Sequence, residues 1–233
     1  MSKSLEEVFE LYQNIHYKLS EIKTKSSYPD DDNRKDIFGV LNSQVIFLQT
    51  LLHVMDTRRI SIQDPSFLNP FQFKAIFGIS IFESWLDTEF QIIPKISLMT
   101  TWNFLIENFF KSLFLKIDSN YISKGYYSIV QGIITQTEIS DPDTKIKTLY
   151  TLALYRNALH NQGVHLPSDS RWDDFSIHVK NTVFSFTKGK KIEITFSELA
   201  VLLDATIDIL DEIINSQKIQ DITEKIPLTL STD

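Results

Sequence analysis

The sequence predicts an all-α protein, a helical bundle of about seven helices with one small β-hairpin before the last helix. Three observations predict this fold class. Apolar residues recur at intervals of three and four along most of the chain, which is the spacing of amphipathic helices. Only 6 of the 233 residues are Gly and 7 are Pro, so long disordered stretches between the helices are not expected. Strand-like alternation is confined to residues 174–195.

The N-terminal part of the chain is expected to be three helices. Apolar series at helical spacing predict helices over residues 5–25, 37–55 and about 70–91. Asn69 and Pro70 favour the third of these, because they supply an N-cap and a proline in the first helical turn, where its missing N–H is not needed.

Three further helices are expected in the middle of the chain. Pro94 is predicted to begin a fourth helix that ends near Ile117, and residues 120–137 are predicted to form a fifth. The sixth helix is expected over 141–162 and should stop at Gly163, because glycine tolerates the left-handed conformation that ends many helices.

A hairpin and a last helix follow. Apolar residues alternate within 183–186 and 192–194, and the Thr-Lys-Gly-Lys segment 187–190 between them is typical of a turn. Ser197 is predicted to cap the last helix, and the chain after about Lys218 is expected to be frayed.

We expect a single domain, because 233 residues that are 42% hydrophobic can close one substantial core. Its three parts are N-terminal helices over 1–93, a bundle that carries the candidate motif over 94–217, and a tail over 218–233.

Composition excludes several kinds of chemistry. The absence of cysteine excludes disulfides, thiolate nucleophiles and cysteine-bound zinc. The sequence also lacks a paired-histidine motif for another metal, so we expect no metal and no cofactor. A net charge of −7 disfavours non-specific binding of nucleic acid over a large surface of the protein, so any RNA contact should be local. Segment 38–55 is too polar for a membrane span, and the N-terminus lacks a signal-peptide layout, so we expect a cytoplasmic protein with no membrane partner.

One segment suggests chemistry. On a helix over 141–162, Leu149, Ala153, Arg156 and His160 fall on one narrow stripe, with Asn157 at its rim. A guanidinium and an imidazole among leucines are costly unless each finds a partner, so their presence needs a reason.

A purely structural reason is available. A histidine in the last turn is favoured by the helix dipole, and Arg156 could pair with a carboxylate such as Glu107. The spacing alone leaves this interpretation and a functional one open.

The segment Arg156-Asn157-x-x-His160-Asn161-x-Gly163 resembles the HEPN superfamily. The resemblance also includes the order of elements over 94–217. HEPN proteins are helical bundles common in prokaryotic toxin–antitoxin, abortive-infection and antiviral defence systems, and many are metal-independent ribonucleases. Their motif is an arginine, a polar residue and a histidine, the last two generally separated by three residues. Here two residues separate Asn157 from His160.

The resemblance implies a site and a partner. His160 would act as general acid or base on RNA, Arg156 would stabilise charge on the phosphate, and Asn157 would orient it, without a metal. His165 is a possible auxiliary residue. HEPN sites are typically shared across a two-fold dimer, so we expect a homodimer through the 141–162 helix.

Two functions remain open. One is a HEPN-type endoribonuclease of a defence or toxin system. The other is a non-catalytic HEPN-like module that regulates a partner protein encoded nearby, which the acidic charge and the shortened motif favour. A small-ligand sensor has no sequence feature in its support.

Overall fold

The computed structural model describes residues 5–63, 79–118 and 125–227. It confirms the all-α bundle with one two-stranded hairpin. The elements in these residues are the helices α1 (Leu5–Lys25), α2 (Asn33–Gln63), α5 (Ile79–Ile117), α6 (Tyr126–Thr137), α7 (Pro142–His160), α8 (Phe196–Asn215) and α9 (Gln217–Gln220), a 3-10 turn η2 (Ser170–Trp172), and the strands β1 (Asp174–Val179) and β2 (Thr182–Thr187).

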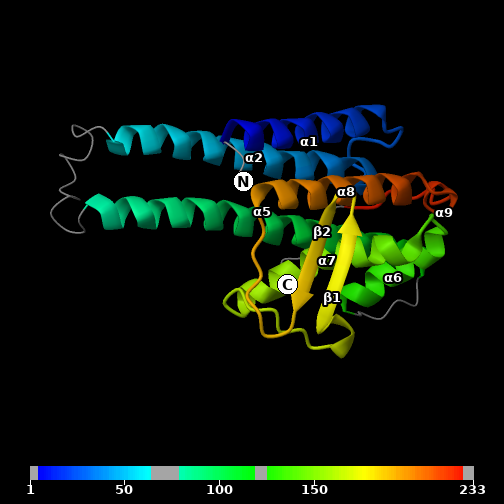
Figure 1. The fold of residues 1–233 in the computed structure, drawn as a ribbon. Helices are drawn as coiled ribbons and strands as arrows, with labels where there is room; N and C mark the ends of the chain where they lie inside the picture. The colour runs from blue at the N-terminus through cyan, green and yellow to red at the C-terminus, as the bar shows by residue number, and fades with distance from the viewer. Residues whose placement is uncertain (1–4, 64–78, 119–124, 228–233) are drawn as a thin grey trace.

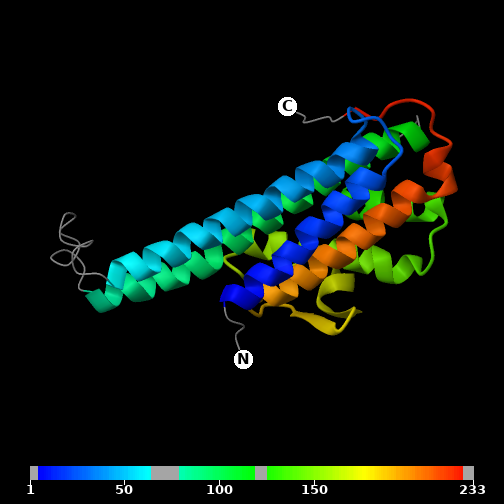
Figure 2. The same ribbon diagram turned by 90° about the horizontal axis from the view of Figure 1, so that it is seen from above.

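The long helices run alongside one another, and α2 and α5 extend past the others as a two-helix arm (Figures 1 and 2). Helix α1 packs on α2 and α8, which brings the two ends of the chain together in one layer. Helices α6 and α7 pack against α5, and the hairpin lies against α7 and α8. The motif helix α7 is therefore an inner element, covered from several sides.

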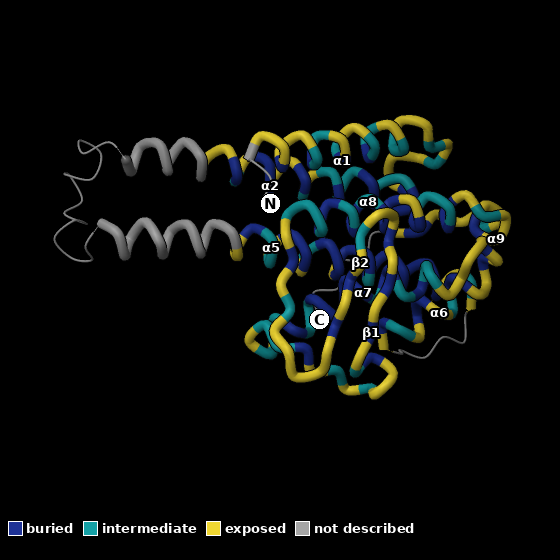
Figure 3. Tube along the Cα trace, viewed as in Figure 1, coloured by how far each residue is buried: buried dark blue, intermediate teal, exposed yellow. Residues whose placement is uncertain are grey.

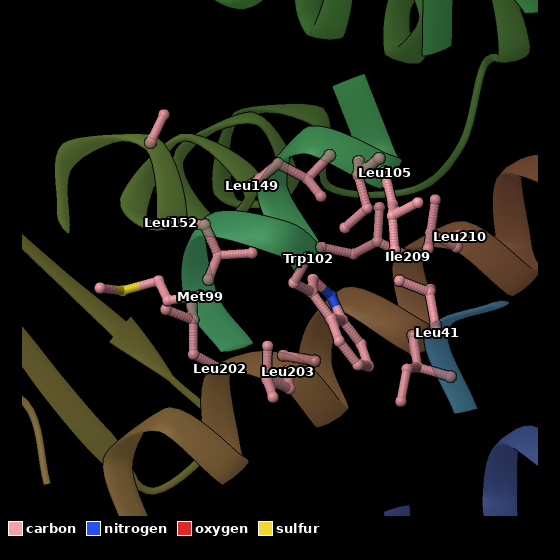
Figure 4. Close-up of a cluster of buried hydrophobic side chains, with 14 of the residues drawn as sticks. Leu41, Met99, Trp102, Leu105, Leu149, Leu152, Leu202, Leu203, Ile209 and Leu210 are labelled. Carbon is pink, nitrogen blue, oxygen red and sulfur yellow. The ribbon is translucent and has the colours of Figure 1, made fainter. Parts of the chain in front are cut away.

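The core is centred on α5, which contacts α2, α6, α7 and α8. Trp102 of α5 is fully buried, and apolar side chains of α2, α7 and α8 surround its ring (Figure 4). Buried positions form the inner sides of all these helices (Figure 3). The apolar residues recur at helical spacing, so each helix carries them on one face, and this face packs into the core.

The predicted helix start at Pro94 is wrong. Helix α5 continues through Pro94, although a proline inside a helix removes one hydrogen bond and crowds the preceding turn. Pro94 is buried, and α2 runs alongside α5 (Figure 2). Packing thus outweighs the local penalty. Of the helix predicted over 70–91, residues 79–91 belong to α5, and the remainder lies outside the described residues.

The hairpin lies earlier in the sequence than predicted. Its strands pair Phe175 with Phe186 and Val179 with Thr182, and the chain turns at Lys180, whose φ is 53°. Glycine is the usual residue in such a left-handed position, so the sequence conceals this turn. Of the segment 187–190, which looked like the turn, Thr187 is the last residue of the second strand and 188–190 follow it.

The predicted cap and tail also need correction. Thr195, and not Ser197, caps α8: its hydroxyl accepts from the Glu198 N–H, and the Glu198 carboxylate accepts from the Thr195 N–H. The chain after Lys218 is ordered as far as it is described, because Ile219 and Ile226 are both fully buried.

Arg34 holds this C-terminal segment. Its guanidinium pairs with Asp32 at 2.6 Å and donates to the carbonyl oxygens of Ile219, Ile222 and Glu224. Asp32 has an exposed fraction of 0% and Arg34 of 3%. A buried ion pair this well hydrogen-bonded is costly to break, because the remaining charge would have no partner.

One apolar segment of α2, Asn33–Val54, is long and apolar enough to cross a membrane by length and composition, with a mean hydropathy of 1.5. Part of it is a core face here, because Ile37, Leu41 and Val45 are fully buried in the bundle. Core helices of soluble proteins pass the same test, so this segment is weak support for a membrane span.

We predict that Arg34→Ala lowers the free energy of unfolding by about 3 kcal/mol, because it leaves the Asp32 carboxylate buried and unpaired. Urea denaturation measures this change. The double variant Asp32→Ala/Arg34→Ala should be more stable than the single one. Lys25→Ala, which removes an exposed pair with Glu21, is the control and should cost much less. An Arg34→Ala loss no larger than that of the control would contradict the prediction.

Candidate functional site

The motif stripe of α7 runs from the core to the surface. Leu149 and Ala153 are buried, with exposed fractions of 0% and 1%. The Arg156 side chain is 28% exposed, and His160, one turn later, is exposed. The expectation that both polar groups share a packed face therefore holds only in part: the stripe leaves the core at Arg156, and its last residue faces water.

The helix ends as its sequence predicts, with a left-handed turn. Gln162 and Gly163 have φ values of 57° and 81°. The Gly163 N–H donates to the carbonyl of Ala158 at 2.8 Å, and the Gln162 N–H donates to that of Leu159 at 3.2 Å. These bonds satisfy the last helical carbonyls and fix His160 at the exposed end of α7.

Arg156 lies between α7 and α5. Its Nη1 is 3.2 Å from Oε2 of Glu107, the carboxylate that the sequence offered as a partner, and its Nη2 donates to Asn157 Oδ1 at 3.4 Å. The other oxygen of Glu107 is 2.8 Å from Nζ of Lys111. Two cations and one carboxylate leave this cluster with a net positive charge, which suits an anionic ligand.

Some buried polar atoms around this ion pair have no hydrogen-bond partner among the described residues. They are Nε of Arg156, the hydroxyl of Tyr126, and both amide atoms of Asn103. Asn103 is one helical turn before Glu107 on α5. Buried polar atoms without partners are rare and costly, so this cluster has hydrogen-bonding capacity that a buried water could use.

Tyr126 belongs to the same electrostatic environment. Burial raises the pKa of its hydroxyl, the charge of Glu107 raises it further, and Arg156 acts in the opposite direction. The hydroxyl therefore stays protonated and neutral at physiological pH.

The two histidines of the segment occupy different environments. His160 is exposed and free to meet a ligand in solution. His165 has an exposed fraction of 1%, packs against the ring of Phe186, and its Nε2 is 2.5 Å from the carbonyl oxygen of Trp172. Since a carbonyl oxygen only accepts hydrogen bonds, Nε2 carries a proton and donates it to this bond. The arrangement gives His165 a structural part in joining α7 to the hairpin.

Sequence reasoning missed Lys111 and Tyr126. Lys111 lies four residues after Glu107, a spacing that could have identified the pair. Tyr126 carried no signal, because its position depends on how α6 crosses α5. Among residues 5–63, 79–118 and 125–227, no three His, Asp or Glu side chains lie together in a way that could hold a metal ion.

Comparison with known proteins identifies no relative: no protein-family model, curated protein or solved structure matches this chain.

We predict that Tyr126→Phe leaves stability unchanged or raises it by about 1 kcal/mol, because it removes a buried hydroxyl without a partner. Tyr12→Phe is the matched control. Tyr12 is also buried, but its hydroxyl donates to the Phe196 carbonyl at 3.0 Å, so this variant should lose about 1 kcal/mol. Urea denaturation of both variants tests the comparison. Equal losses would mean that the Tyr126 hydroxyl has a partner after all.

Proposed function

We propose that the protein is a metal-independent endoribonuclease of the HEPN type, acting in a prokaryotic defence or toxin system. One observation carries this proposal: the Arg156 side chain is 28% exposed, and its guanidinium lies one helical turn from the exposed imidazole of His160. Phosphate oxygens are the acceptors that a guanidinium binds best, and an accessible imidazole beside a bound phosphate can move protons.

The proposed reaction is attack of a ribose 2′-oxygen on the adjacent phosphorus. The 2′-hydroxyl loses its proton as the P–O2′ bond forms, and the 5′-oxygen gains a proton as the P–O5′ bond breaks. The products are a 2′,3′-cyclic phosphate and a 5′-hydroxyl. Arg156 would stabilise the charge on the equatorial oxygens, and Asn157, whose amide contacts Arg156, would position the phosphate.

His160 supplies one proton-transfer group, whereas this reaction uses an acid and a base. His165 is buried and hydrogen-bonded, so it is not the second group. A second copy of the chain would provide one if two α7 helices met across a two-fold axis. The side chains of α7 are mostly buried within one chain, so the dimer we propose uses its exposed C-terminal end near His160.

The second candidate is a non-catalytic HEPN-like module that binds a partner protein encoded nearby. The Arg156–Glu107 ion pair favours it, because an arginine with an internal partner can be structural. The net charge of −7 also suits a protein partner better than RNA. For both candidates we propose a cytoplasmic location.

We predict that the purified protein cleaves RNA in the presence of EDTA. His160→Ala should reduce the rate about 10²-fold or more, because it removes a proton-transfer group, and Arg156→Ala should have an effect of similar size. Gel analysis of labelled RNA measures the rates. His178→Ala is the control, since His178 is exposed on β1, and should leave the rate unchanged. Cleavage that is equal in all variants would indicate a contaminant, and its absence from the wild type would favour the binding module.

We also predict a homodimer in solution. Light scattering coupled to size-exclusion chromatography should give twice the chain mass of 27.0 kDa at micromolar concentration. His160→Glu should shift the protein toward monomer, because it would place like charges opposite each other at the axis. The same change at His178, an exposed position on the hairpin, is the control. A wild-type monomer would remove the shared site from the proposal.

A further inference from the structure

An aromatic cluster joins α6, α7 and the turn before the hairpin. The rings of Tyr127 and Tyr150 are edge to face at 5.2 Å between centroids, and Trp172 lies 4.4 Å from Tyr150 and 5.5 Å from Tyr127. Trp172 is buried, whereas both tyrosines are partly exposed. The cluster therefore has a rigid apolar base and an accessible outer side.

Arg171 covers this outer side. Its guanidinium carbon lies 4.8 Å above the centroid of the Tyr127 ring. Its Nε and Nη2 donate to the carboxylate of Asp169 at 2.9 and 2.5 Å. The guanidinium thus lies over the tyrosine ring, and one of its edges is paired. Because the side chain is 60% exposed, much of the guanidinium is open to solvent.

The cluster is electrostatically connected to Arg156. Burial raises the pKa of the Tyr150 hydroxyl and so does Asp169, whereas the charges of Arg171 and Arg156 act in the opposite direction. Tyr150 thus lies within electrostatic range of both arginines. It is also seven residues before Asn157 on α7, which places the two side chains on the same side of the helix.

We propose that the exposed guanidinium of Arg171, held over the ring of Tyr127, is a stacking platform for a nucleobase of single-stranded RNA next to the phosphate that Arg156 binds. The inference rests on the proposed function, because RNA is the ligand at Arg156. Unpaired bases are recognised by stacking on aromatic rings and on guanidinium planes, and both are present here.

Arg171 is better suited to a base than to a phosphate. The edge that could form a two-point contact with phosphate is already occupied by Asp169, and this carboxylate would repel an anion. Pairing also fixes the orientation of the plane, so little side-chain freedom is lost when a base stacks on it.

Binding of 2′-O-methyl RNA tests this platform, because blocked 2′-hydroxyls prevent cleavage and separate binding from catalysis. We compare a labelled adenine oligonucleotide of about 12 residues, within the range of known single-strand sites, with an abasic one of equal length and charge. Fluorescence anisotropy should show about tenfold tighter binding of the adenine strand by the wild type. Arg171→Ala should bring this ratio close to one.

Arg171→Lys separates stacking from charge, because lysine keeps the cation and loses the plane. We expect it to lose the preference for bases as Arg171→Ala does, while Lys25→Ala, which removes an exposed paired cation of α1, retains it. A preference that survives in Arg171→Lys, equal binding of both strands by the wild type, or no binding of either would overturn the inference. A base preference in a protein that cleaves no unmodified RNA would instead refute the ribonuclease and leave the platform standing.

Discussion

The packing of α5 against four other helices is the constraint on which the structure depends. Trp102 at its centre is enclosed by side chains of α2, α7 and α8, so none of these helices can move without opening the core (Figure 4). Five residues further along α5, Glu107 meets Arg156 of α7. The same helix therefore fixes both the hydrophobic centre and the polar cluster at its edge, and the position of the candidate site follows from the packing of the core.

The candidate site combines features of a structural and a functional arginine. Glu107 provides Arg156 with an internal partner, which offsets the cost of its partial burial. The Nε of Arg156 has no hydrogen-bond partner among the described residues, and Lys111 gives the cluster a net positive charge. An arginine held in place but not fully occupied is suited to binding an anion, because its orientation is set before the ligand arrives. The platform at Arg171 follows the same principle, with Asp169 as the partner that orients the plane.

Much of the fold could be predicted, because the helical periodicity of apolar residues indicates which face of each helix is buried. The end of α7 at the left-handed turn and the partner of Arg156 were also within reach of the sequence. Features set by long-range packing were not. Pro94 continues a helix because α2 supports it, and the hairpin turns at Lys180, a residue type that gives no local signal for a left-handed conformation. The cluster around Tyr127 is assembled from three separate elements, so no single segment could reveal it.

The ties of Arg34 to the C-terminal segment have a consequence for biosynthesis. Arg34 is 185 to 190 positions away from the carbonyls to which it donates. Helix α1 likewise packs against α8, which is near the other end of the chain. On the ribosome, the first two helices emerge long before the elements that cover them. Part of their apolar surface stays uncovered, and the hydrogen bonds of Arg34 to the C-terminal carbonyls stay unmade, until nearly the whole chain has been translated.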